Sequence, residues 1–168
     1  MFKEIILILI LMFSGCSSIM NKNEVTLPKN QKYAISSFWN YTETPMAGFR
    51  ASSIVEGVIS QKNITLYSLI GGTNEMENIK TKELFIDQKK EEAKKLGALY
   101  LITGDVQEWR YKTGIDGEPV VSYTLKIIDL NTNQTIFSGV GAKSGWGHKS
   151  IGVVAQEIAK ELIPKFIN

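Results

Sequence analysis

Apolar and polar residues alternate over residues 120–129, and this two-residue period predicts a strand with one buried face. The turn sequence LNTNQ follows at 130–134, and residues 135–142 form a second apolar segment. Because strands joined by so short a turn pair as a hairpin, we expect an antiparallel pair here. Residues 98–111 begin as a continuous apolar run before they alternate, which is typical of a central strand that emerges towards solvent.

Two segments have helical spacing instead: residues 47–62 and 151–166. Residues 80–96 are highly charged and are followed by Gly97, a typical residue just beyond a helix C-terminus, so a helix is expected there too. Residues 32–39 and 63–70 complete the set as two further short strands. The resulting order is β-α-β-α-β-β-β-α. It predicts one α/β domain, in which a mixed β-sheet is covered by helices.

Two helix ends depend on single residues. Thr44 precedes Pro45 and is the predicted N-cap of the first helix. Pro164 is expected to disturb only the last turn of the final helix, because the helical spacing continues as far as Phe166.

The N-terminus predicts export and lipidation. Lys3 precedes an apolar run at 5–13 that is too short to span a bilayer but suits a signal peptide. The residues FSGC that end at Cys16 resemble the bacterial lipobox, in which the cysteine becomes the acylated N-terminus. Residues 1–15 would then be removed as a lipoprotein signal peptide. An ordinary secretion signal with a chance cysteine is the alternative.

The cysteine content agrees with acylation. Cys16 is the single cysteine, so no disulfide can form within one chain. Residues 16–31 are polar and without a period, so we interpret them as a lipidated tether that is about 50 Å long when extended. Residues 32–168 would form the periplasmic α/β domain. The net charge of +2 gives no argument for nucleic acid.

Catalytic motifs are absent from the sequence, which lacks a G-x-S-x-G sequence and a phosphate-binding loop. His148 is the single histidine, so a multi-histidine metal site is excluded. Two carboxylates could in principle act as a glycosidase pair, but ordinary solvated carboxylates explain the acidic residues better. We therefore expect no enzyme, no cofactor and no metal.

The sequence resembles the CsgG-related outer-membrane lipoproteins in its second half, through the positions Gly97, Ala98, Tyr100, Gly104, Val106, Asp129, Thr132 and Ser138. The stretch 38–64, which contains NYTETP and AGFRA, resembles the PelC family of Pel exopolysaccharide export. That resemblance implies a lipid-anchored ring of about a dozen subunits on the periplasmic face of the outer membrane. The implied partners are a PelB-like porin and a cationic polysaccharide.

The resemblance also implies roles for single residues. Trp146 lies between two glycines and matches the family tryptophan near the last helix, so it is expected to contact the membrane interface, with Lys149 meeting lipid phosphates. Packing of Trp146 on its own sheet or on a neighbouring subunit is the alternative. Arg50 is a candidate for the subunit interface, with an ordinary surface arginine as the alternative.

A set of acidic residues at strand ends or in loops could attract a cationic polymer when repeated around a ring. This set comprises Glu43, Asp105, Glu108, Asp116, Glu118 and Asp129. A different class of function also fits the same fold: a monomeric regulatory lipoprotein that binds and activates a periplasmic cell-wall synthase.

Overall fold

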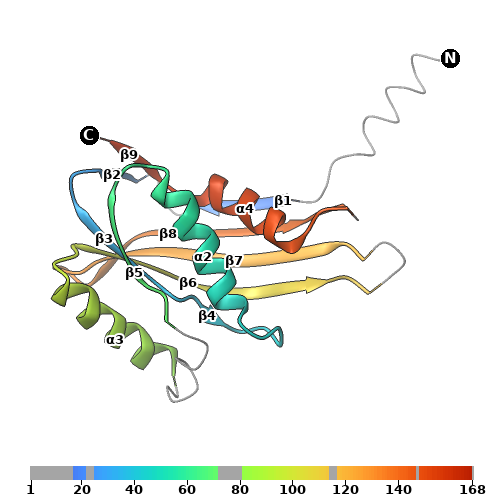
Figure 1. Ribbon diagram of the computed structural model, residues 1–168, viewed down its shortest axis with the longest axis horizontal. Helices are drawn as coiled ribbons and strands as arrows, with labels where there is room; N and C mark the ends of the chain where they lie inside the picture. The colour runs from blue at the N-terminus through green and yellow to red at the C-terminus, as the bar shows by residue number, and fades with distance from the viewer. Residues whose placement is uncertain (1–16, 22–24, 72–80, 114–116, 147, 168) are drawn as a thin grey trace, which may run out of the picture.

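The computed structural model describes residues 17–21, 25–71, 81–113, 117–146 and 148–167. Most of its strands form one seven-stranded mixed sheet (Figure 1). The strands of this sheet are β1 (Ser17–Asn21), β3 (Lys32–Ser36), β4 (Trp39–Asn40), β5 (Thr65–Leu69), β6 (Tyr100–Tyr111), β7 (Pro119–Asp129) and β8 (Gln134–Ser144). A separate parallel pair joins β2 (Thr26–Pro28) to β9 (Lys165–Ile167).

The order of strands across the sheet is β1-β8-β7-β6-β3-β5, with β4 added to β6. The long strands β6, β7 and β8 are antiparallel neighbours, whereas β3 is parallel to both β5 and β6. Because β6 and β7 pair Tyr100 with Asp129 and Tyr111 with Pro119, the β6–β7 connection and the β7–β8 turn lie at opposite ends of the sheet.

Helices cover the two faces unequally. α2 (Ala47–Ser60) and α4 (Ile151–Leu162) lie against each other on one face, where they bury the main apolar core (Figure 1). α3 (Lys82–Lys95) covers the other face only over β3, β5 and β6. Alternate residues of β6 show the two faces, since Ile102 belongs to the main core and Leu101 to the smaller core beneath α3.

The predicted fold class is confirmed, because the eight expected elements occur in the expected order as β3, α2, β5, α3, β6, β7, β8 and α4. The expectation of an irregular tether over residues 16–31 is wrong in part. Residues 17–21 form β1 at the edge of the main sheet, and residues 26–28 form β2. Leu27 of β2 is only 2% exposed, so this segment joins the folded domain.

Two expected helix ends are also corrected. The N-cap position of α2 is Met46, in a left-handed conformation with φ 63°, and no side chain caps this end. Thr44 instead donates its hydroxyl to the Trp109 carbonyl at 2.5 Å, which fastens the loop to β6. The final helix ends at Leu162 because Ile163, which precedes Pro164, adopts an extended conformation with ψ 124°.

Candidate functional site

The loop between β8 and α4 presents the Trp146 side chain, which is 52% exposed. Gly145 is buried, and a Cβ added there would lie 2.7 Å from Val154 Cγ2 and 2.9 Å from Pro119 Cγ. Gly145 therefore permits close packing of the loop on the domain. Gly147, the second glycine of the predicted hinge, lies outside the described residues. The indole thus projects from a loop that is packed on one side.

Lys149 is already engaged within the chain. Its Nζ lies 2.7 Å from Glu157 Oε1, and its backbone N–H donates to the Trp146 carbonyl at 2.8 Å. Glu157 Oε2 also contacts Lys143 Nζ at 2.8 Å. The hydrogen bond from Lys143 lowers the pKa of Glu157, and the same bond raises the pKa of Lys143. Glu157 therefore offsets the positive charge that was expected to meet lipid phosphates.

Tyr111 is a second aromatic residue at this end of the sheet that the sequence analysis did not single out. It is 52% exposed and is the last residue of β6, directly opposite Pro119 of β7. The sequence signal that could have identified Tyr111 is its position at the end of an alternating strand, directly before a polar loop.

Asp105 has a structural environment. It is 5% exposed, and its carboxylate binds Lys82 of α3 and the amide of Gln107. Lys126 Nζ lies 3.9 Å from the same carboxylate. Asp105 therefore ties α3 to the sheet, and the surrounding lysines offset its charge.

The structure brings Glu43 and Glu108 together, since both line a hollow of about 340 Å³ beside the end of β6. Glu108 pairs with Arg110 at 3.2 Å, and Glu118 on the adjoining hairpin pairs with Lys112 at 2.8 Å. Glu43 is exposed and forms no ion pair with any residue of the described ranges.

The remaining predicted residues do not join this group. Asp129 lies at the opposite end of the sheet, where its Oδ1 accepts hydrogen bonds from the backbone N–H groups of Asn131 and Thr132 at 2.8 and 3.0 Å. It therefore stabilises the β7–β8 turn. Asp116 and Cys16 lie outside the described residues, so their predicted roles remain predictions.

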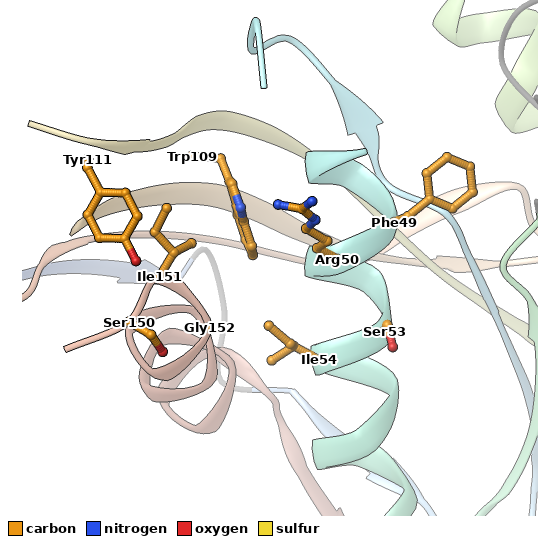
Figure 2. A pocket seen from close by; sticks show the side chains of 9 residues that line it. All are labelled: Phe49, Arg50, Ser53, Ile54, Trp109, Tyr111, Ser150, Ile151 and Gly152. Carbon is orange, nitrogen blue, oxygen red and sulfur yellow. The ribbon is translucent and has the colours of Figure 1, made fainter. Parts of the chain in front are cut away.

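Arg50 lines an open cavity of about 590 Å³ between α2, the start of α4 and the end of β6. Figure 2 shows its guanidinium between Trp109 and α2, with Ile151 and Tyr111 further along the cavity. A second hollow of about 420 Å³ continues along α2 and α4 and shares Ser53, Ile54, Ser150 and Gly152 with the first. We call the two together the α2–α4 groove.

The described residues contain no group of three or more His, Cys, Asp or Glu side chains that could hold a metal ion. His148, the single histidine, is exposed in the loop before α4. Within the ranges that the structure covers, no helix has both the length and the apolar character needed to cross a membrane.

Solved structures similar to this chain include the PelC dodecamer of Paraburkholderia phytofirmans. It is 31% identical, with a TM-score of 0.73, over 88% of this chain and 94% of that chain. A single-substitution variant of that dodecamer is 34% identical, with a TM-score of 0.75, over 89% and 98%. Lipoprotein GNA1162 of Neisseria meningitidis, at 12% identity and a TM-score of 0.57 over 78% and 94%, shares the fold. No family model and no curated protein matches the sequence.

Proposed function

The chain belongs to the PelC family, and we propose on this basis that it is a ring-forming, non-enzymatic lipoprotein of the outer membrane. The ring would assist the export of a cationic exopolysaccharide, of the Pel type, through a PelB-like porin. The observation that carries the proposal is the likeness to dodecameric PelC over 88–89% of this chain.

Membrane attachment is proposed to combine two features. Acylation of Cys16 would anchor the chain, since each buried CH₂ of an acyl chain contributes about 0.8 kcal/mol. Trp146 would enter the bilayer interface, where an indole keeps its N–H near water and its ring in an apolar layer. Its 52% exposure supports this role.

The α2–α4 groove is the surface that we assign to the contact between neighbouring subunits, and it includes Arg50. A ring needs heterologous contacts, in which one patch meets a different patch of the next copy. Gly57 on α2 supports this assignment, because a Cβ there would meet nothing within 4 Å. A glycine inside an exposed helix costs about 1 kcal/mol relative to alanine. The close approach of another chain gives a reason for it.

Attraction of a cationic polymer would depend on Glu43 and Glu108, which line one hollow. Glu108 is partly offset by Arg110, so Glu43 contributes the less compensated charge. Repetition in a ring would multiply this modest charge. Asp105 contributes little to such a field because its carboxylate is buried and bound to Lys82.

Native mass spectrometry of the full lipidated protein, extracted in detergent, tests the proposal. We expect a closed oligomer of about a dozen subunits. Arg50→Ala should shift the population towards smaller species, whereas Lys90→Ala on α3, outside the groove, should leave it unchanged. A strict monomer in detergent and in membranes would refute the ring and favour the regulatory lipoprotein.

A further inference from the structure

One face of the sheet is bare over part of β7, β8 and β1 in the described ranges. At Gly141 of β8 an added Cβ would meet Ile158 and Leu162 of α4, so residue 141 faces the helices. Because successive side chains of a strand point to opposite faces, Val140 and Ala142 face the other way. α3, the helix on that side, lies over β3, β5 and β6. Figure 1 views the sheet from the side of α2 and α4, so the bare part is turned away from the viewer.

This bare surface consists of two adjacent cross-strand rows, each with one residue from β1, β8 and β7 in direct register. The rows are Met20, Val140 and Thr124, and Ser18, Ala142 and Ser122. We call these six residues the open sheet face. Met20 is 71% exposed and Val140 is 42% exposed. A long apolar side chain therefore projects from an otherwise flat surface.

The open sheet face carries no charged side chain, although charged residues make up 21% of the sequence. The solvated face of an antiparallel sheet normally carries polar side chains in alternation with the buried ones. Depletion of charged residues together with an exposed methionine is typical of the centre of a protein–protein interface. The open sheet face therefore fits a protein partner better than it fits water.

The α2–α4 groove, on the opposite side of the domain, has a matching character. The residues that line its smaller hollow, of about 420 Å³, are all uncharged: Ser53, Ile54, Gly57, Val58, Gln61, Ser150, Gly152, Val153 and Gln156. An added Cβ would meet nothing within 4 Å at Gly57, and only Ser150 Oγ at 3.9 Å at Gly152. Both glycines thus leave space that their own chain does not fill. One surface offers a projecting side chain and the other offers a hollow.

The two surfaces lie on opposite sides of one sheet, which is the arrangement that a closed ring requires. In a head-to-tail contact, one patch meets a different patch of the next copy, and every copy uses both patches. In a ring of twelve, as in the PelC dodecamer that this chain resembles, successive copies are turned by about 30°. The two patches of each copy must therefore point in nearly opposite directions.

We propose that the open sheet face of one copy packs on the α2–α4 groove of the next copy, with Met20 inserted over Gly57. The inference rests on the proposed ring, and it adds the second patch that the subunit contact needs. The partner is a second copy of this chain, because the two surfaces are both uncharged where they meet, complementary in shape and placed on opposite faces.

Thiol cross-linking of the full lipidated protein tests which surfaces meet. We expect Met20→Cys/Gly57→Cys, treated with a short bismaleimide, to give covalently linked chains up to the complete ring on a denaturing gel. Each single variant should give no more linked chains than the wild type, which also reports any contribution of Cys16. The matched control Leu84→Cys/Gly57→Cys should stay at that background, because Leu84 is 60% exposed but lies on α3.

Native mass spectrometry of the full chain tests whether the contact stabilises the ring. Met20→Asp would place a charge against the uncharged hollow, so we expect it to convert most rings to smaller species, whereas Met20→Leu should keep them. Gly57→Leu should have the same effect as Met20→Asp, because it fills the hollow. The open space around position 57 lets the single chain fold, which circular dichroism checks. The matched control Leu84→Asp should leave the ring intact.

Each outcome decides the inference. Linked chains from Gly57→Cys alone would show that one groove meets another groove, and equal linking in the Leu84 control would show that the reaction does not report the contact surfaces. Rings that survive both Met20→Asp and Gly57→Leu would also overturn the inference, while the ring itself would stand. A wild-type chain that is monomeric refutes the ring, so the two failures are distinguishable.

Discussion

Replacement of Asp105 distinguishes a structural carboxylate from one that attracts polymer. The Asp105 side chain is 7% exposed and binds Lys82, whose own side chain is 17% exposed. Asp105→Asn keeps the shape and one acceptor oxygen but removes the negative charge. Lys82 and the nearby Lys126 would then lie close together without a counter-ion.

The magnitude follows from this geometry. Removing one partner of a buried ion pair costs about 3–5 kcal/mol, and removing one bond to a charged group costs about 1.5–3 kcal/mol. The Lys126 side chain is 35% exposed, and Lys82 keeps some contact with water. We therefore expect the cost of the substitution to fall in the lower of these two ranges. The free energy of unfolding should fall by about 2 kcal/mol.

Urea denaturation at one fixed protein concentration measures the effect, since an oligomer's apparent stability depends on concentration. Glu43→Gln is the control: it removes an exposed carboxylate and should change the free energy of unfolding by less than about 0.5 kcal/mol. The double variant Lys82→Met/Asp105→Asn should recover part of the loss. If Asp105→Asn leaves stability unchanged but weakens binding of a cationic polysaccharide, the structural interpretation is refuted.

Three further results are expected. Glu43→Gln should weaken binding of a cationic polysaccharide, measured by calorimetry, by about 0.2–1 kcal/mol per contact, and no loss in an intact ring would exclude the role. Glu157 has a lowered pKa because of Lys143, so its contribution to stability is present above pH 4.5 and is lost as the pH falls through the lowered value. Glu157→Gln should flatten that loss in acid denaturation. Gly141→Val should lower stability by about 1–3 kcal/mol, because its Cβ would lie 2.3 Å from Ile158 Cγ2; an unchanged urea midpoint would contradict this packing.

The hairpin β7–β8 and the three helices could be predicted because their patterns are local. The hairpin, α2 and α4 each have a period of two or 3.6 residues that persists over several turns or pairs and indicates the buried face directly, whereas α3 was indicated by its charged composition and by Gly97 just beyond its end. The N-terminus of α3 also has a local N-cap, because the Thr81 hydroxyl accepts a hydrogen bond from Leu84 N–H at 3.3 Å. Such signals do not depend on residues far away in the chain.

The edge strand β1 could not be predicted from its own residues. SSIMN contains two apolar residues that point to opposite faces, and its partner β8 lies more than 100 residues later in the chain. This segment forms a strand because it pairs with the backbone at the edge of β8 and because Gly141 leaves room for Ile19. The end of α4 was missed for a different reason: the spacing of apolar residues continues past Pro164, but the backbone at Ile163 cannot remain helical.

The same distinction between local signals and long-range packing applies to the candidate site. Exposure of Trp146 could be anticipated from its glycine neighbours, although Gly145 is needed for close packing. The ion pairs of Lys149 and Asp105 could not be anticipated, because their partners Glu157 and Lys82 come from elements whose packing the sequence does not encode locally. A sequence shows which residues are charged, but the counter-ion that each of them meets depends on the tertiary structure.

The acidic residues fall into two groups whichever side of the subunit faces the centre of a ring. Asp129 pairs with Tyr100 at one end of β6, whereas Glu108 and Glu118 lie towards the other end, near Tyr111. A ring would therefore carry its acidic residues at two separate levels, about 30 Å apart along the strands. If Trp146 contacts the bilayer, as proposed, the level of Glu108 is the one nearer the membrane, because β8 ends beside Val120 of β7 and Arg110 of β6. Under the proposed function, a cationic polymer moving towards the membrane would therefore pass the level of Asp129 before the level of Glu108, where Arg110 and Lys112 reduce the negative charge.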